Sequence, residues 1–365
     1  MKNTVIASVL LASVSSAASA QSSVTLYGIV DTDIRYVTNT NKNGDSSIGM
    51  GNGGLAESRF GVKGTEDLGQ GLSTIFQLEN RFYANSGQLD SAKPFWNTAF
   101  VGVRSRQWGE LTIGRQSTTL ISIVSQAYAS NPWVPFSNVF LPEVIMVGGD
   151  RTSNLVKYTL RAADLYGQAS YALGGVAGNS GYGSQTAVGV GWFPGAVRIA
   201  GGYAVIHDST NGAPAQIWTA GGSYTWNTTQ FHAGYFQSRL SSNFMSYQNG
   251  PYSEQALSAI KYLDFSSRRM MSLGVTQSVG PALHLAFNYW RTWQTGKTEK
   301  QDGTASQFQL LADYYLSKRT DVYLEGDYGL YRQDLIGTTL AGLSSGGAPA
   351  KSTQLGVTVG IRHSF

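Results

Sequence analysis

An alternation of apolar and polar residues recurs along almost the whole chain, and it is the strongest constraint on the fold. The last twelve residues show it most clearly. One face would carry Leu355, Val357, Val359, Ile361, His363 and Phe365, and the other Gln354, Gly356, Thr358, Gly360, Arg362 and Ser364. Successive side chains of a β-strand point to opposite faces, so this pattern predicts strands with one apolar and one polar face. Similar patterns occupy residues 24–35, 307–315 and 321–328.

The polar faces carry charged residues in strand after strand, for example Asp31 and Asp33, and later Asp313, Glu325 and Asp327. The inner face of a soluble β-sandwich is a dry core, which does not accommodate repeated charges. A transmembrane antiparallel β-barrel reverses this arrangement, with apolar side chains toward lipid and polar side chains toward a watery lumen. The sequence therefore predicts an all-β barrel of this kind.

Short and long connections alternate between the expected strands. Tight turns are predicted at 67–70, 107–109, 193–195, 226–228, 279–281 and 318–320. Longer polar or glycine-rich links are predicted at 38–54, 85–94, 174–183, 207–215, 294–304 and 333–351. Outer-membrane barrels have short turns on the periplasmic side and long loops outside.

The alternation of short and long connections determines the predicted number of strands. Seventeen strand-like segments can be marked, whereas bacterial barrels of this kind have an even number. The segment Ser253–Phe265 alternates poorly, and Lys261 and Asp264 have no matching apolar face. Placing it in an outer loop, Leu240–Ser267, restores the alternation and predicts sixteen strands.

The N-terminus indicates export. Lys2 precedes the apolar stretch Val5–Val14, and Ala18-Ser19-Ala20 has the small-x-small form of a cleavage site. We expect residues 1–20 to be a signal peptide and 21–365 to form the barrel. The chain has no cysteine, so disulfides cannot stabilise it, and its formal charge of +4 is too small to suggest a nucleic-acid partner.

Several segments together resemble the general porins of Gram-negative outer membranes, of the sixteen-stranded beta-proteobacterial type. They are SVTLYGIVD (23–31), SRFGVKGTEDLG (58–69), FQLE (76–79), AFVGV (99–103), GELTIGRQ (109–116) and VGIRHSF (359–365). The resemblance implies a homotrimer of water-filled channels in outer-membrane lipid and lipopolysaccharide, for passive diffusion of small hydrophilic solutes and ions. The terminal Phe365 resembles the membrane-insertion signal of this class.

The resemblance also implies a third loop that folds inward and narrows the pore, which we place at Gln116–Ser153. It contains Tyr128, Trp133, Phe136 and Phe140, which could stack on solutes or pack the loop against the wall; we favour packing. Its only acids are Glu143 and Asp150, so we expect the wall to dominate the electric field across the pore.

Strand parity selects the candidate pore-lining charges. The set comprises Arg59, Arg81, Arg151, Lys63, Lys157, Glu79, Asp31, Asp33 and Arg35. By resemblance, Arg59 and Arg151 match pore-wall arginines of the family, whereas Asn97 stands where the family often has another arginine. Charge rings in a narrow pore can set selectivity. We expect Arg59, Arg81 and Arg151 to form the constriction and to give a modest anion preference.

No enzyme motif is convincing, so we expect neither catalysis nor a metal or cofactor. The glycines at 49–54 do not lie between a strand and a helix, and the four histidines lack metal-ligand spacing. Three alternatives remain open. One is a substrate-specific channel that uses the third-loop aromatics, and the others are a barrel enzyme and a soluble secreted β-protein that acts as a binding module.

Overall fold

The computed structural model describes residues 23–90, 94–131, 142–245, 254–340 and 347–365. The expected signal peptide lies outside these residues. No helix in the described part of the chain is long and apolar enough to cross a membrane. The strands are β1 (Ser23–Val37), β2 (Ser47–Gly51), β3 (Arg59–Gly69), β4 (Leu72–Arg81), β5 (Thr98–Ser105), β6 (Gly109–Ser117), β7 (Arg151–Ala162), β8 (Leu165–Ala172), β9 (Gln185–Trp192), β10 (Val197–His207), β11 (Pro214–Trp226), β12 (Thr229–Leu240), β13 (Phe265–Val279), β14 (Leu283–Gly296), β15 (Gly303–Tyr315), β16 (Thr320–Gln333) and β17 (Thr353–Ser364). The helices are α2 (Thr119–Ala127), α3 (Pro142–Met146), α4 (Glu254–Ala259) and the 3-10 helix η1 (Glu299–Gln301).

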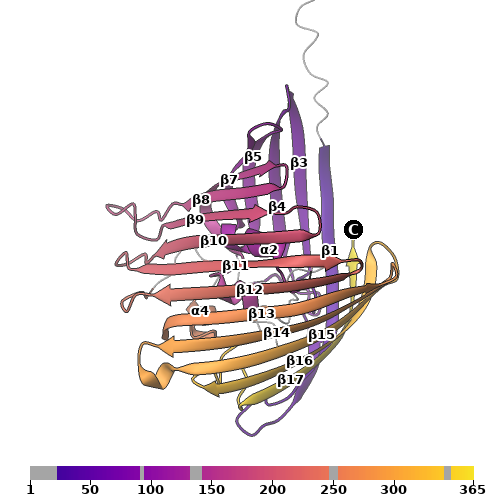
Figure 1. Cartoon of the computed structure of the whole chain (residues 1–365), viewed down its shortest axis with the longest axis vertical. Coiled ribbons are helices and arrows are strands. Elements are labelled where there is room, and N and C mark those ends of the chain that lie inside the picture. The colour runs from indigo at the N-terminus through magenta and orange to yellow at the C-terminus, as the bar shows by residue number, and fades with distance from the viewer. Residues whose placement is uncertain (1–22, 91–93, 132–141, 246–253, 341–346) are drawn as a thin grey trace, which may run out of the picture.

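The strands form one antiparallel sheet that closes on itself, because β1 pairs with β17 (Figure 1). Phe365 completes this junction. Its backbone N–H donates to the Gly28 carbonyl at 3.0 Å, and its carbonyl accepts from the Gly28 N–H at 3.1 Å. A closed barrel leaves no unpaired sheet edge in the lipid.

Two of the strand segments occupy one position in the barrel. On the side of β1 that faces away from β17, β3 pairs with Ser23–Ile29 and β2 pairs with Asp33–Val37. Residues 52–58 connect these two segments, so the seventeen segments fill sixteen positions, and the predicted count is confirmed.

The loop assignment that gave this count is also confirmed in its main point. The segment 253–265, excluded from the strands, holds the helix α4, and only its last residue, Phe265, belongs to β13. One link was wrong in detail, because 38–54 was expected to be a loop and contains β2. A further tight turn, at Ala163–Asp164 between β7 and β8, was not predicted; Ala163 adopts a positive φ of 48° there.

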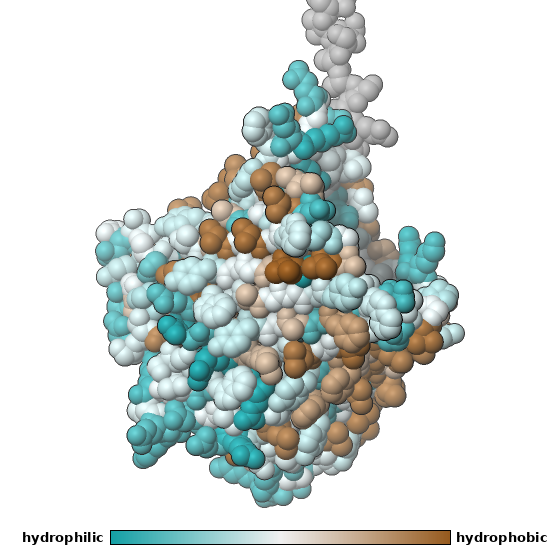
Figure 2. Space-filling model, in the orientation of Figure 1, coloured by the Kyte–Doolittle hydropathy of each residue, from teal (hydrophilic) through white to brown (hydrophobic). Residues whose placement is uncertain are grey.

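The outer surface is apolar along the strands. In β9 the residues Thr186, Val188, Val190 and Trp192 point outward and alternate with buried neighbours. Figure 2 shows apolar side chains over the strands and hydrophilic side chains gathered where the long loops lie. The alternation in the sequence therefore reflects lipid on one side of each strand and the lumen on the other.

Candidate functional site: the pore and its constriction

The third loop, between β6 and β7, folds into the barrel and lies against one half of the wall. Helix α2 packs on β8, β9, β10 and β11, and α3 packs on β12 and β13. Their apolar side chains share a buried cluster with the wall, including Leu120, Ile123, Val124, Phe236 and Trp290. The predicted inward fold is confirmed. The apolar residues of the loop explain why its described helices adhere to this wall.

Glycines on the inner wall provide the space for this packing. A Cβ at Gly189 would lie 2.5 Å from Ile123, and one at Gly202 would lie 2.8 Å from Leu120. Glycines 221 and 234 lie beneath the Tyr128 ring, where a Cβ would approach it to 2.7 and 2.8 Å. These four wall glycines form a socket for the loop.

Tyr128 is held in this socket with 1% of its surface exposed. Its hydroxyl lies 2.7 Å from the Thr219 hydroxyl, and its ring packs beside Phe236. Packing, rather than solute contact, is therefore the role of Tyr128. The other predicted loop aromatics, Trp133, Phe136 and Phe140, lie outside the described residues.

The buried carboxylate of Glu143 connects the last part of the third loop to the barrel wall. The Ser130 hydroxyl donates to Glu143 Oε1 at 2.6 Å, and the Trp290 indole of β14 also hydrogen-bonds this carboxylate. Burial raises the pKa of Glu143 above its ordinary value. Glu143 was expected to be one of the few charges of the loop, but here it anchors the loop.

The three predicted constriction arginines lie together on the opposite part of the wall. Arg59 and Arg81 are register partners on β3 and β4, and Arg151 begins β7. Glu79 connects two of them, because Arg151 Nη2 lies 3.2 Å from its Oε1 and Arg59 Nη1 lies 3.9 Å from the same atom. We call Arg59, Arg81 and Arg151 the pore arginines.

Acids compensate this cluster more fully than the sequence indicated. Asp150, at the end of the third loop, pairs with Arg151 and lies 3.2 Å from Arg81 Nη2, and Glu57 pairs with Arg81. The expectation that the loop would bring almost no acid to the arginines was therefore wrong. Asp150 directly precedes β7, so the return of the loop places its carboxylate among them.

Asn97 lies between two of the pore arginines. With its amide oxygen turned toward them, it accepts hydrogen bonds from Arg81 at 2.8 Å and from Arg151 at 3.2 Å. The Thr98 hydroxyl accepts from Arg151 Nε at 2.9 Å. A neutral acceptor here stabilises two adjacent guanidinium groups, where a third arginine would repel them.

Asp31 and Asp33 are on the inner face, as predicted. The prediction that they line the open water of the lumen was wrong. Residues 52–58 fold inward over them, and Asp31 is fully buried. The backbone N–H groups of Leu55 and Ala56 donate to Asp31 Oδ2 at 3.2 and 2.7 Å, and the Tyr323 hydroxyl donates to Oδ1 at 2.6 Å. The inward fold of residues 52–58 was not predicted from the sequence. These residues separate two strand segments that share one barrel position, in a region that was expected to be part loop and part strand.

The remaining candidates differ in how open they are. Arg35 is buried and pairs with Asp327 at 2.7 Å, and Lys157 is buried with Nζ 2.9 Å from the Ser117 carbonyl. Lys63 is exposed, and its Nζ lies 5.2 Å from the centre of the Tyr27 ring. A further pair, Arg362 with Asp321 at 3.0 Å, was not among the predicted site residues. Of these candidates, Lys63 is the most open to water.

This architecture has known relatives. The profile of the Gram-negative porins matches residues 7–334. The chain belongs to the Gram-negative porin family. It is 31% identical to an outer membrane porin protein of Bordetella pertussis and 31% identical to outer membrane porin protein 32 of Delftia acidovorans, each alignment covering 100% of both chains.

Solved structures of outer-membrane porins have the same fold as this chain. The anion-selective porin from Comamonas acidovorans superposes with a TM-score of 0.75 and 26% identity, over 94% of this chain and 100% of that one. The Salmonella typhi OmpF complex with daunomycin shares the fold, with a TM-score of 0.65 at 17% identity. The protein is therefore an outer-membrane porin, a β-barrel channel through which small hydrophilic solutes and ions diffuse passively. The wall described above is the wall of that channel.

Proposed function

We propose that this porin has a modest preference for anions. The observation that carries the proposal is that acids of the inner wall are enclosed or held in close ion pairs, including the partly exposed Glu57 and Asp150, whereas two basic residues remain partly open. Asp31 is enclosed by backbone amides, Glu79 is shared by two arginines and Tyr27, and Asp327 is paired with Arg35. By contrast, Lys63 is exposed and the Arg59 side chain is 23% exposed.

Exposure matters because an ion in the pore interacts with whatever charge lies within reach through water. Salt screens exposed charges over about 8 Å at physiological ionic strength, so only charges near the narrow part contribute. Arg81 is already neutralised by Glu57 and Asp150. The preference should therefore be weak and should depend on Arg59 and Lys63. The Comamonas relative, described as anion-selective, supports the sign.

The test is the reversal potential of the trimer or monomer in a planar bilayer under a tenfold KCl gradient. Wild type should favour chloride, and Arg59→Gln with Lys63→Gln should shift the permeability ratio toward potassium by a factor of about two to five, since one charge about 4 Å from an ion in water contributes about 1 kcal/mol. The matched control is Lys318→Gln with Arg319→Gln, which removes the same charge at an exposed turn between β15 and β16. An unchanged ratio in the first double variant, or cation preference in wild type, contradicts the proposal.

We also propose that the channel acts without catalysis and assembles as a homotrimer in contact with lipid and lipopolysaccharide. Membership of a channel family supports the first point, and the resemblance to trimeric general porins supports the second. A substrate-specific channel that stacks solutes on Tyr128 is disfavoured by the burial of that ring. A covalent serine-hydrolase probe that labels the folded barrel would argue for an enzyme.

A further inference from the structure

Residues 52–58 form a second segment inside the barrel, in addition to the third loop, and we call them the inner strap. Gly51 pairs with Asp33 before the strap, and Arg59 pairs with Ile29 after it. Only three residues of β1 lie between these two partners, so three residues would be enough to continue the paired strand. The strap has seven. The four additional residues give it the length to leave the wall and enter the lumen.

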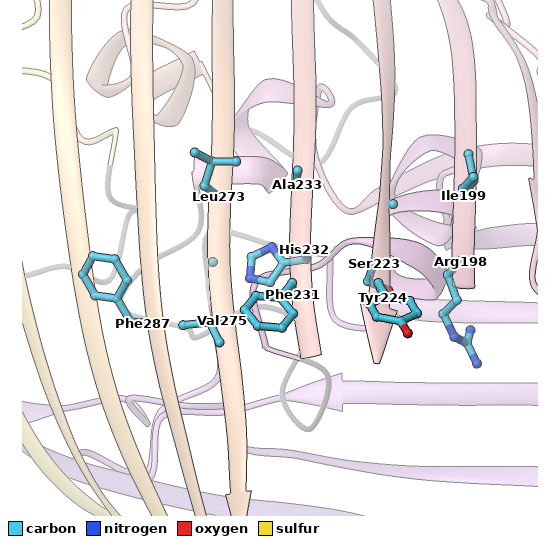
Figure 3. A pocket seen from close by; sticks show the side chains of 12 residues that line it. Arg198, Ile199, Ser223, Tyr224, Phe231, His232, Ala233, Leu273, Val275 and Phe287 are labelled. Atoms are coloured by element: carbon cyan, nitrogen blue, oxygen red, sulfur yellow. The ribbon is translucent and has the colours of Figure 1, made fainter. Parts of the chain in front are cut away.

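The inner strap and the third-loop helices cover different parts of the inner wall. The helices α2 and α3 pack on β8 to β13. Figure 3 shows strands from this part of the wall at close range, with Ile199, Phe231 and Leu273 on their lipid-facing side. The strap instead lies against β14, β15 and β16. Together the two segments line the inner wall from β8 to β16.

Leu55 anchors the inner strap to its part of the wall. The Leu55 side chain is fully buried beside one residue from each of the three strands, namely Ala286, Leu311 and Tyr323. The Tyr323 hydroxyl accepts from the Gly54 N–H at 2.7 Å and donates to Asp31 Oδ1 at 2.6 Å. Apolar contacts and hydrogen bonds therefore hold the strap at a defined position in the lumen.

The inner strap reaches the level of the pore arginines. Glu57, near its end, forms an ion pair with Arg81, and Arg81 Nη2 lies 3.2 Å from Asp150 Oδ2 of the third loop. One arginine of the wall thus connects the strap to the third loop. The Glu57 side chain is 23% exposed, so this end of the strap is open to the water of the lumen. Both segments therefore occupy the same cross-section of the channel.

We propose that the inner strap is a second constriction element of this channel and that it sets the size limit for uncharged solutes together with the third loop. Leu55 and Tyr323 hold the strap inward, and Glu57 positions its end beside the pore arginines. Pore diameter and the groups that line the pore both determine which solutes pass. The proposal concerns solute size, so its outcome is independent of the anion preference proposed above.

The pairing register supplies the variant that tests the proposal. Deletion of residues 53–56 removes the four additional residues, and the remaining Asn52, Glu57 and Ser58 continue the strand with its two faces unchanged. Liposome swelling with neutral sugars of increasing size should show a larger size limit than wild type, and the single-channel conductance should rise. Deletion of residues 177–180, four exposed residues between β8 and β9, is the matched control and should change neither quantity. A strap deletion with the size limit and conductance of wild type overturns the proposal.

A second measurement keeps the four residues in place. The chain has no cysteine, so Glu57→Cys introduces a single thiol. A neutral maleimide added to this channel should lower its conductance, because the added group narrows the lumen beside the strap. Asn179→Cys, on the exposed loop between β8 and β9, should react without a change in conductance.

Mass spectrometry verifies the reaction of each thiol, and heat-modified migration on a gel verifies that each variant is a folded barrel. A Glu57→Cys thiol that does not react overturns the proposal, because this end of the strap would then lie away from the lumen water. A reacted Glu57→Cys channel with unchanged conductance overturns it as well. A strap deletion that fails to fold leaves the decision to this thiol measurement.

Discussion

Single glycines determine how closely the third loop approaches the wall. At Gly234 of β12, the three atoms nearest to an added Cβ belong to side chains: the Ser272 hydroxyl and the Tyr128 ring at 2.8 Å, and Phe236 at 3.0 Å. Neighbouring side chains cannot all move, because the cluster around them is closely packed. From the sequence, Gly234 is only a small residue on the polar face of a strand. The structure explains why a glycine is needed there, because the Tyr128 ring lies directly above it.

Gly234→Ala should push Tyr128 and the loop toward the open lumen. Overpacking of this kind costs about 1–3 kcal/mol, so we expect a lower unfolding temperature together with a smaller single-channel conductance in 1 M KCl. Gly167→Ala is the matched control, since a Cβ there meets nothing within 4 Å. Unchanged conductance and stability in Gly234→Ala would show that the ring is not seated on this glycine.

Gly28 has a corresponding role at the junction that closes the barrel. A Cβ at this position would lie 2.3 Å from the Phe365 ring and 2.8 Å from the Arg59 carbonyl. Gly28→Val should therefore reduce the yield of folded barrel, as measured by heat-modified migration on a gel after refolding into detergent. Gly49→Val, also in the first strands but in open space, should refold like wild type.

Burial of Glu143 predicts that the stability of the third loop depends on pH. Because burial raises the folded-state pKa of Glu143 above the ordinary carboxyl value of 4.5, the neutral form is favoured in the folded loop. Its stabilising contribution is fully present below pH 4.5 and is lost as the pH rises through the raised pKa. At higher pH the loop should therefore be held less firmly.

We expect the current noise of single channels to increase as the pH rises from 4 to 8, and Glu143→Gln to remove most of this dependence. Glutamine retains the shape and the neutral state of the side chain. Glu299→Gln, in the 3-10 helix η1 outside the barrel wall, serves as the comparison. Noise that depends on pH equally in wild type and in Glu143→Gln would show that another group controls the loop.

The strands could be predicted from the sequence, whereas the inward segments could be predicted only in part. The alternation of apolar and polar residues identified the two faces of each strand, because lipid and water lie on opposite sides of every strand. The same alternation, applied to each strand separately, predicted that Arg59, Arg81 and Arg151 lie on the inner wall. The segment 52–58 and the position of Asp150 had no such periodicity. Their partners are 24–27 and 69 residues away, so their contacts depend on how a whole loop returns.

At the scale of the whole molecule, the proposed homotrimer requires the barrel to associate with two copies of itself. We expect light scattering in mild detergent to give the mass of a trimer for protein extracted from its native membrane. Finding only monomers would contradict this.

The pairing of β1 with β17 has a consequence for the order of assembly. The two partners are the first and last strands, and Ile29 faces Ser364 across more than 330 positions of chain. The other neighbouring pairs can form before the last strand is present, except β16 with β17, and only the β1–β17 pair needs both ends of the chain. A shortened C-terminus would leave two open edges in place of a joined wall, and each would be free to pair with another chain. The barrel becomes a separate compartment only when its final residues are in place.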